Sequence, residues 1–469
     1  MSALQEDHPA NETAATVVSP LVEQAGRHPY RTILRLALPV FVEQALIFGV
    51  DMTDTYLSGR IGEAATEAIC VAGYVGWMAS MIFSLIGIGT TALVARAWGA
   101  GQREEAGRIT ARSLLLASCL SIPVFCLLQL IAPSAAKFLN LEGESFRIAV
   151  EYLRCDAFGH IFTCGTMIAG AALRGSGDMR TPMLVLAVVN VINVVVSAGT
   201  VYGWGPFPEL GVLGIVTGTV VAKIIGALLM LAALGTGWSH LRLRWADFQF
   251  DSAVTRRLLQ IGGPACLDGL ITVCGHFIFL RVISLVKAHQ PGALAAHLVG
   301  VRVEALSYLP AMAWGISAAS LVGQSLGAHR PEQAVRIGHA AARQSLLYAS
   351  IISILFFTCA QQIYEFMHRD AAVVAAGVPA LTLMAIYQIP TATLMVYVSC
   401  LRGAGDTRFP LLFAIIGVLG VRVPVAYYFG VVREGGLAGA WIGMGADLCL
   451  RSALTFWRYS SARWTKISV

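Results

Sequence analysis

Long apolar stretches follow one another along most of the chain, separated by short polar segments rich in glycine and arginine. Each stretch runs for about 20 residues or more, which is enough helix to cross a hydrocarbon core of about 30 Å. The stretches are continuous and lack the polar and apolar alternation of a membrane β-barrel, so the pattern predicts an all-α membrane protein. We expect about twelve transmembrane helices. The predicted spans are residues 33–58, 68–95, 112–132, 148–172, 182–203, 211–236, 258–287, 295–322, 341–367, 374–401, 409–430 and 436–457.

The amino-acid composition agrees with this pattern and bears on which partners the protein binds. Hydrophobic residues make up 57% of the 469 positions and charged residues 13%, whereas soluble domains carry about one quarter charged residues. The net charge is +6, but the arginines concentrate in every second connecting segment, as the positive-inside rule describes. We therefore expect a multi-pass protein that lies in the lipid bilayer, binds no nucleic acid and has both termini in the cytoplasm.

An internal duplication sets the expected architecture. Leu173–Pro182 recurs as Leu401–Pro410, both carrying Leu-Arg-Gly-x-Gly-Asp-x-Arg-x-Pro, at an offset of 228 residues. Six spans separate the copies, and an even number returns the chain to the same side, so the repeats are parallel and form two six-helix bundles. The predicted domains are a flexible cytoplasmic tail (1–30), an amino-terminal lobe (31–237), a basic cytoplasmic linker (238–257), a carboxyl-terminal lobe (258–457) and a second cytoplasmic tail (458–469).

Ionisable side chains within the first span are candidates for function, because such groups are costly in hydrocarbon. Asp54 is the first choice, since a carboxyl group in a cavity of low polarity binds a proton or a small cation readily. The alternative is a solvated carboxylate at the outer helix end, beside Tyr56 and Arg60. Asp51, one turn earlier, either joins the site or makes a local hydrogen bond. Glu43, three turns earlier, either lines the inward pathway or pairs with a neighbouring helix.

The second half offers candidates for a substrate contact or a gate. Asp268 lies in the seventh span, Glu304 in the eighth and Asp447 in the twelfth. We expect Arg422 to neutralise Asp447, either as a structural pair or as a gate. Glu304 is suited to attracting cationic substrates. Tyr387 belongs to a set of aromatic and methionine side chains that would suit an apolar pocket for flat cations, although ordinary helix packing is the alternative.

Several of these segments together resemble the multidrug and toxic compound extrusion family of transporters, over about residues 30–457. The resemblance implies an inner-membrane antiporter that expels cationic or amphipathic compounds in exchange for protons or sodium ions. It also implies a V-shaped pair of six-helix bundles. The residues that carry it are Pro39 with Gln44, Asp54-Thr55, Gly99-Ala100, the two Arg-Gly-x-Gly-Asp copies and Leu321–Ala328.

The resemblance also implies a cation site in the amino-terminal lobe. Asp54 stands at the position of the coupling acid in members whose amino-terminal lobe binds the cation. Asn193 and Thr219 align with further positions of that site, and their oxygens suit sodium; an interhelical hydrogen bond is the alternative for Asn193. Ser197 stands where those members usually carry a second acid, which puts sodium coordination by Asp54 and Asn193 in doubt and tilts the expectation toward protons.

No second cation site of this kind is implied in the carboxyl-terminal lobe, because Thr272 and Thr391 stand where sodium-coupled members carry acids. Beyond the coupling ion we expect no cofactor and no metal, and we expect a monomer that exports small molecules. Protease, hydrolase and nucleotide-binding motifs are missing from the sequence, so an enzyme is not predicted. The competing hypotheses are a flippase for lipid-linked sugars from the same superfamily, and a passive channel or membrane receptor.

Overall fold

The structure is a computed structural model that describes residues 19–138, 141–238, 241–286 and 289–467. Within these residues every regular element is a helix, so the predicted all-α class is confirmed. Helices are what an apolar chain forms in a bilayer, because they satisfy each backbone amide and carbonyl internally. Every predicted span falls inside a continuous helical run to within one residue at either end.

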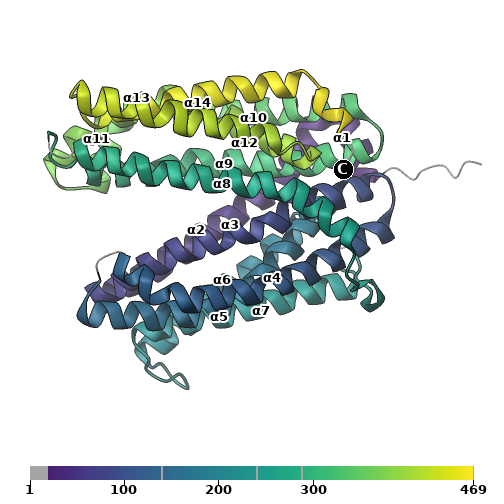
Figure 1. The fold of residues 1–469 in the computed structure, drawn as a ribbon, viewed down its shortest axis with the longest axis horizontal. Helices are drawn as coiled ribbons and strands as arrows, with labels where there is room; N and C mark the ends of the chain where they lie inside the picture. Colours follow the sequence, from purple (N-terminus) through teal and green to yellow (C-terminus); the bar gives the residue numbers. More distant parts are fainter. Residues whose placement is uncertain (1–18, 139–140, 239–240, 287–288, 468–469) are drawn as a thin grey trace, which may run out of the picture.

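The amino-terminal half is a set of long helices that we call the amino lobe (Figure 1). It is preceded by a short helix, α1 (Pro20–Arg27). Its members are α2 (Pro29–Ile61), α3 (Glu63–Gly99), α4 (Arg103–Phe138), α5 (Gly143–Ser176), α6 (Arg180–Tyr202) and α7 (Val212–Thr236).

The carboxyl-terminal half forms the carboxyl lobe, drawn in green to yellow above the amino lobe in Figure 1. The chain between Arg408 and Val432 is one helical run, in which η2 and η3 have the wider winding of a π-helix. The elements are α8 (Ser252–Val286), α9 (Ala293–Gly327), α10 (Pro331–Met367), α11 (Ala371–Ala404), α12 (Arg408–Ala414), η2 (Ile415–Arg422), α13 (Val423–Tyr427), η3 (Tyr428–Val432), α14 (Gly436–Ser460) and η4 (Arg463–Lys466).

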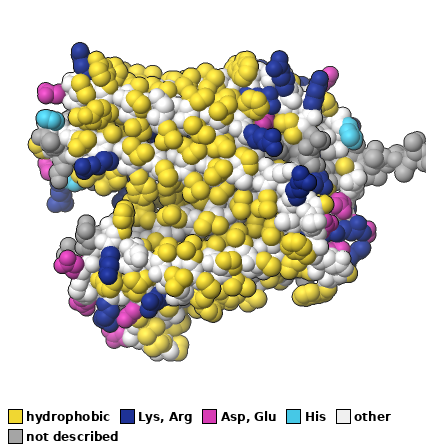
Figure 2. Space-filling view, in the orientation of Figure 1, with side chains coloured by type: hydrophobic (Ala, Val, Ile, Leu, Met, Phe, Trp, Pro, Cys, Tyr) yellow, Lys and Arg dark blue, Asp and Glu magenta, His cyan; other side chains and the backbone are white. Residues whose placement is uncertain are grey.

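Apolar and charged side chains are distributed over the surface as expected for a protein that lies in a bilayer. Among the described residues, 10 helical runs are long and apolar enough to cross a membrane, judged by length and composition. The long helices α5 and α14 are not among these 10. Figure 2 shows apolar side chains across the middle of the molecule and charged side chains gathered toward its two ends. An apolar belt between two charged ends is what lipid tails and head groups require.

The duplicated Arg-Gly-x-Gly-Asp segments end α5 and α11 in the same way. Gly177 and Gly405 adopt left-handed conformations, with φ of 93° and 89°. The amides of Asp178 and Asp406 then reach back to the carbonyls five residues earlier, at 2.9 Å and 2.8 Å. This hydrogen-bond pattern is the Schellman cap, which needs glycine because other side chains are strained at such φ values. The second glycine of each copy is therefore required by the turn.

The first predicted tail, residues 1–30, needs correction in its described part; residues 1–18 lie outside that part. Helix α1 occupies Pro20–Arg27, and α2 follows after a single residue. Val22 and Ala25 are 0% and 1% exposed. These apolar side chains, spaced three residues apart on one helical face, anchor α1 to the protein body, which a polar composition alone did not indicate.

The second predicted tail, residues 458–469, is also anchored where it is described; residues 468–469 are not covered. The side chain of Trp464 in η4 is fully buried. Its ring stacks on Tyr459 with centroids 4.7 Å apart, and its indole N–H donates to the Tyr459 carbonyl at 2.7 Å. One buried tryptophan therefore fixes the end of the chain to the carboxyl lobe.

The segment between the lobes, residues 238–257, lies against α4 in its described part, which lacks only residues 239–240. Arg112 of α4 forms an ion pair with Asp251 at 2.9 Å. The backbone amide of Val254 and that of the residue before it donate to the Asp251 carboxylate, and these bonds hold its pKa below the usual value. Asp251 therefore caps the start of α8 as well as joining the linker to α4.

The two lobes meet where α3 crosses α9. The pairs Arg96 with Gln324 and Gly99 with Gly327 are each related by the repeat offset of 228. A side chain at Gly99 would overlap the carbonyl of Gln324, and one at Gly327 would overlap the carbonyl of Arg96. The crossing is therefore pseudo-symmetric, and each glycine lets the backbone of the other lobe come into direct contact.

Hydrogen bonds between the lobes reinforce this crossing, and we call them the clasp. The Arg96 guanidinium donates to the carbonyls of Ala404 and Ile467 at 2.8 Å and 2.9 Å. The Gln324 amide donates in the opposite direction, to the carbonyl of Gly175 at 2.9 Å. Arg96 and Gln324 occupy equivalent repeat positions, so the clasp follows the symmetry of the duplication. It holds together the ends of α3, α5, α9 and α11.

Candidate cation site

Asp54 lies in the interior of the amino lobe, at a point where α2, α6 and α7 meet. Its side chain is buried, with 8% of the residue exposed. The Thr219 hydroxyl donates to its Oδ2 at 3.3 Å, and the Asn193 amide donates to the Thr219 oxygen at 3.1 Å. Tyr56 and Arg60 hydrogen-bond to each other on the exposed side of α2. The structure thus brings together Asp54, Asn193 and Thr219, and it does not pair Asp54 with Arg60.

Two oxygens of this group lack hydrogen-bond donors. Oδ1 of Asp54 and Oδ1 of Asn193 are both buried without a partner in the described residues. A buried acceptor with no donor costs free energy. A small cation, or a proton on the carboxyl group, would satisfy such oxygens, and carboxylate and amide oxygens suit sodium. The oxygens of this group therefore fit a monovalent cation or a proton.

Ser197 serves the contact between α6 and α7 instead of this group. It is fully buried, and its hydroxyl donates to the Ile215 carbonyl at 3.3 Å. Gly218 faces it, and an added side chain there would overlap the serine. At the position where the resembling family usually carries a second acid, this chain therefore has a close-packed serine. Asp54 is the carboxylate of the group that it forms with Asn193 and Thr219.

The other two acids of α2 lie in different surroundings. Glu43 is 7% exposed and pairs with Arg174 of α5 at 2.8 Å. Of the two alternatives considered for Glu43, the structure contains the pair with a neighbouring helix. Asp51 is exposed, and no salt bridge to it occurs among the described residues. It lies one turn from Asp54, where it adds a second negative charge.

A buried charged cluster lies beside this group; the sequence points to Lys223 as an ionisable side chain within an apolar span, but Asp156 and His160 were missed. Asp156 of α5 accepts from the Lys223 ammonium of α7 at 2.6 Å, and His160 lies 3.1 Å from its other oxygen. Lys223 follows Thr219 by one helical turn, so the cluster is next to the Asp54 group. An acid and a histidine four residues apart in an apolar span were the available signal.

The carboxyl lobe contains a carboxylate held by two arginines. Asp447 of α14 is fully buried and pairs with Arg422 and Arg451, each at 2.6 Å. The expected neutralisation of Asp447 by Arg422 is present in the structure. Arg451 was not predicted, although it stands one turn after Asp447. The π-helical winding of η2 ends at Arg422, which is a common feature of functional or strained helix positions.

The remaining candidates are dispersed in the carboxyl lobe. Asp268 of α8 pairs with Arg402 of α11 at 2.5 Å. Glu304 of α9 is half-buried, and it lies within electrostatic range of Arg422. The ring of Tyr387 lies against α14 at Gly445, where an added side chain would overlap it, so it packs between helices of this lobe.

The charges of the two lobes therefore differ. In the amino lobe three carboxylates, Asp51, Asp54 and Asp156, face one ammonium. In the carboxyl lobe the two carboxylates of Glu304 and Asp447 are balanced by two guanidinium groups. Among the described residues, the buried carboxylates Asp54 and Asp156 of the amino lobe therefore outnumber their ammonium partner even without the exposed Asp51, and an added cation is favoured there.

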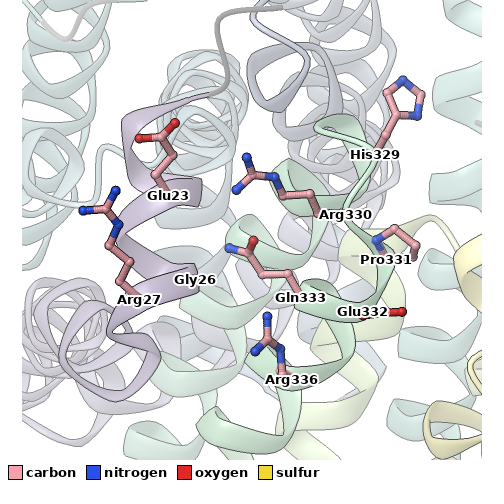
Figure 3. Close-up of a pocket in the computed structure, with 9 residues that line it drawn as sticks. All are labelled: Glu23, Gly26, Arg27, His329, Arg330, Pro331, Glu332, Gln333 and Arg336. Carbon is pink, nitrogen blue, oxygen red and sulfur yellow. The ribbon is translucent and has the colours of Figure 1, made fainter.

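The cavity drawn in Figure 3 is separate from these groups. It measures about 570 Å³ and lies between α1 and the first turns of α10. Its lining residues are Glu23, Gly26, Arg27, His329, Arg330, Pro331, Glu332, Gln333 and Arg336. No cluster of three or more histidine, cysteine, aspartate or glutamate side chains that could hold a metal occurs in the described part of the chain.

Comparison with known proteins identifies the family. The MatE family model matches residues 39–198 and again residues 264–428. The two matches begin at Pro39 and Pro264 and correspond to the two halves of the duplication. The chain therefore belongs to the MatE family, the multidrug and toxic compound extrusion transporters.

Individual relatives extend over nearly the full chain. A probable multidrug resistance protein NorM of Thermotoga maritima is 27% identical over 446 residues, with 94% of each chain covered. A protein of the same name from Rhodopseudomonas palustris is 27% identical over 466 residues, with 96% of each covered.

Solved structures share the fold. A transporter of Pyrococcus furiosus, described as having a binding pocket of reverse polarity, has a TM-score of 0.88 at 20% identity, covering 96% of this chain and all of that one. An outward-facing MATE transporter has a TM-score of 0.87 at 20% identity, covering 95% of this chain and 99% of that one. The protein is thus a multi-pass transporter of the plasma membrane, handling small molecules, and is not an enzyme.

Proposed function

We propose that this protein is a cation-coupled antiporter that exports small cationic or amphipathic compounds by alternating access. The observation that carries the proposal is the buried Asp54 group, with two oxygens that lack donors in the described residues. Cation binding there stabilises one arrangement of the lobes and substrate binding stabilises another, so that exclusive occupancy couples the two flows. The coupling ion is a proton or a sodium ion.

The amino lobe is the coupling lobe in this proposal. Its interior has more carboxylates than cations, whereas Asp447 in the carboxyl lobe is already held by two guanidinium groups. A second coupling ion in the carboxyl lobe would have to compete with these tethered charges. The comparison therefore supports one coupling site, at Asp54.

The proposed topology has twelve transmembrane helices in a V-shaped pair of bundles. The long helices α5 and α14 would add to the 10 apolar runs, their polar residues being buried against neighbouring helices. The basic connecting segments favour cytoplasmic termini. The clasp then lies on the cytoplasmic side, and the hollow between the lobes at the left edge of Figure 2 opens outward.

Substrate binding between the lobes is supported by exposed aromatic side chains at their boundary. Tyr74 of α3 and Phe277 of α8 are both exposed, and their ring centroids are 6.1 Å apart. Aromatic faces attract flat organic cations. Glu304 supplies a negative charge in this scheme, and one protein chain suffices for the transport cycle.

Proteoliposomes test this function. The purified protein would be reconstituted with ethidium, a flat aromatic cation, and efflux would be followed under an imposed pH or sodium gradient. We expect at least one gradient to drive efflux by the parent protein. Asp54→Asn should abolish gradient-driven efflux, because an amide does not take up the coupling cation as a carboxylate does. Glu365→Gln, at an exposed position of α10, is the matched control.

The outcomes separate the proposal from its competitors. If Asp54→Asn shows unchanged efflux, Asp54 has no part in the mechanism. If neither the pH gradient nor the sodium gradient drives efflux by the parent protein, antiport is excluded. A passive channel would equilibrate the dye without an ion gradient, which the backbone contact of α3 with α9 at Gly99 and Gly327 disfavours. A flippase for lipid-linked sugars needs free basic groups for a pyrophosphate, whereas Arg422 and Arg451 are both bound to Asp447.

A further inference from the structure

We propose that Lys223 determines the ion selectivity of the amino lobe by excluding sodium from the Asp54 site. This inference rests on the proposed function and specifies which coupling ion the site accepts. Lys223 lies on α7 one helical turn from Thr219, the residue that joins Asp54 to Asn193. Its ammonium adds a positive charge beside the Asp54 group.

The position of the ammonium is fixed by geometry as well as by charge. It pairs with Asp156 at 2.6 Å, with the lysine side chain 22% exposed and the aspartate 10% exposed. A Cβ at Gly159 of α5 would lie 2.7 Å from Cδ of Lys223, so the glycine makes room for the lysine stem against the helix. The ammonium also lies within electrostatic range of both Asp51 and Asp54.

The duplication supplies an independent comparison. Lys223 and Thr219 correspond, at the offset of 228, to Arg451 and Asp447 of α14. In the carboxyl lobe the basic side chain at this position already binds the carboxylate one turn away, at 2.6 Å. Both lobes therefore place a tethered cation at the same position. In the carboxyl lobe this cation, Arg451, forms an ion pair with Asp447. In the amino lobe the equivalent cation, Lys223, lies near Asp54, the proposed coupling carboxylate.

The physical consequence is selection against a metal ion. A sodium ion at the buried Asp54 would lie within electrostatic range of the Lys223 ammonium, and like charges in surroundings of low polarity repel each other. The close-packed Ser197, in place of a second acid, adds no further carboxylate beside Asp54 that would offset this repulsion.

Sodium binding to the purified protein tests the inference without transport. The melting temperature would be measured in sodium chloride and in choline chloride at equal ionic strength. We expect no sodium-specific stabilisation of the parent and a clear one for Lys223→Gln, with sodium affinity raised about tenfold or more. Lys223→Arg keeps the charge and should behave as the parent. Sodium-specific stabilisation of the parent, or none in Lys223→Gln, would overturn the inference.

Two further variants separate selectivity from simple stability. Gly159→Ala keeps every charge but displaces the lysine stem, so it should gain part of the sodium response. Gly165→Ala on the same helix, where an added Cβ meets nothing within 4 Å, should not. In proteoliposomes a sodium gradient should drive ethidium efflux by Lys223→Gln and not by the parent. Efflux by the parent under a sodium gradient would sink this inference and leave the proposed antiport standing.

Discussion

Buried ion pairs in the two lobes occupy equivalent positions of the repeat. Glu43 pairs with Arg174 in the amino lobe, and Asp268 pairs with Arg402 in the carboxyl lobe. The arginines are related by the offset of 228 and the acids by 225, the offset that also relates Pro39 to Pro264. Each pair joins the first long helix of its lobe to the helix that ends in a Schellman cap. Each of these acids therefore has an arginine partner, whereas Asp54 forms no ion pair among the described residues.

Asp447 is the residue whose loss should cost the most stability in the carboxyl lobe. Asp447→Ala would leave the guanidinium groups of Arg422 and Arg451 buried without a counter-ion. Breaking a buried pair by removing one partner costs about 3–5 kcal/mol. We expect a clearly lower melting temperature by intrinsic tryptophan fluorescence in detergent. Glu434→Ala, in an exposed turn next to α14, is the control; equal melting temperatures for both variants would contradict the expectation.

Single acids and their partners were predictable from the sequence to different extents. Asp54 and Asp447 were found because an acid in a long apolar run stands out against its neighbours. Asp156 was missed, although it also lies within an apolar span, because its partner Lys223 is 67 residues away and only the fold brings them together. Arg451 lies near the end of its span, where an arginine is normally expected to reach water.

Small residues determine how closely the helices of different lobes can approach. Among the described helices, α3 and α9 cross with backbone contact at Gly99 and Gly327. The repeat pattern predicted that two lobes face one another, and it could not predict the crossing point. Both glycines are part of the Gly-Ala segments that carried the family resemblance, so a sequence signal was present. Its structural meaning appears only when the lobes are packed together.

Gly99→Ala should weaken the contact between the lobes, because its Cβ would overlap the Gln324 carbonyl, and a backbone carbonyl cannot swing away. We expect faster amide hydrogen exchange at the ends of α3 and α9, measured by mass spectrometry. Gly73→Ala on the same helix is the matched control, since an added Cβ there meets nothing within 4 Å. Identical exchange in both variants would show that the crossing does not depend on the glycine.

At the scale of the whole molecule, the clasp favours the arrangement of lobes seen here. Arg96 connects α3 of the amino lobe to the end of α11 and to the anchored carboxyl-terminal segment. The sequence predicted a tail after residue 457, because a short polar segment carries no periodic signal. In the structure its buried Trp464 positions the Ile467 carbonyl for Arg96. The end of the chain is therefore part of the contact between lobes.

Removing the clasp should shift the molecule toward the opposite arrangement. Hydrogen bonds to a charged donor contribute about 1.5–3 kcal/mol each, and a loss of about 2 kcal/mol changes the ratio of two conformations about thirtyfold. Arg96→Ala should therefore lengthen the distance between spin labels at Gln102→Cys and Arg330→Cys, which stand at the clasp ends of the two lobes, in a background without native cysteines. Arg108→Ala is the matched control, because in the described part of the chain this α4 arginine forms its ion pairs with Glu105 and with Asp247 of the linker. If the distance distribution is the same with and without Arg96, the Arg96 hydrogen bonds do not determine the arrangement of the lobes.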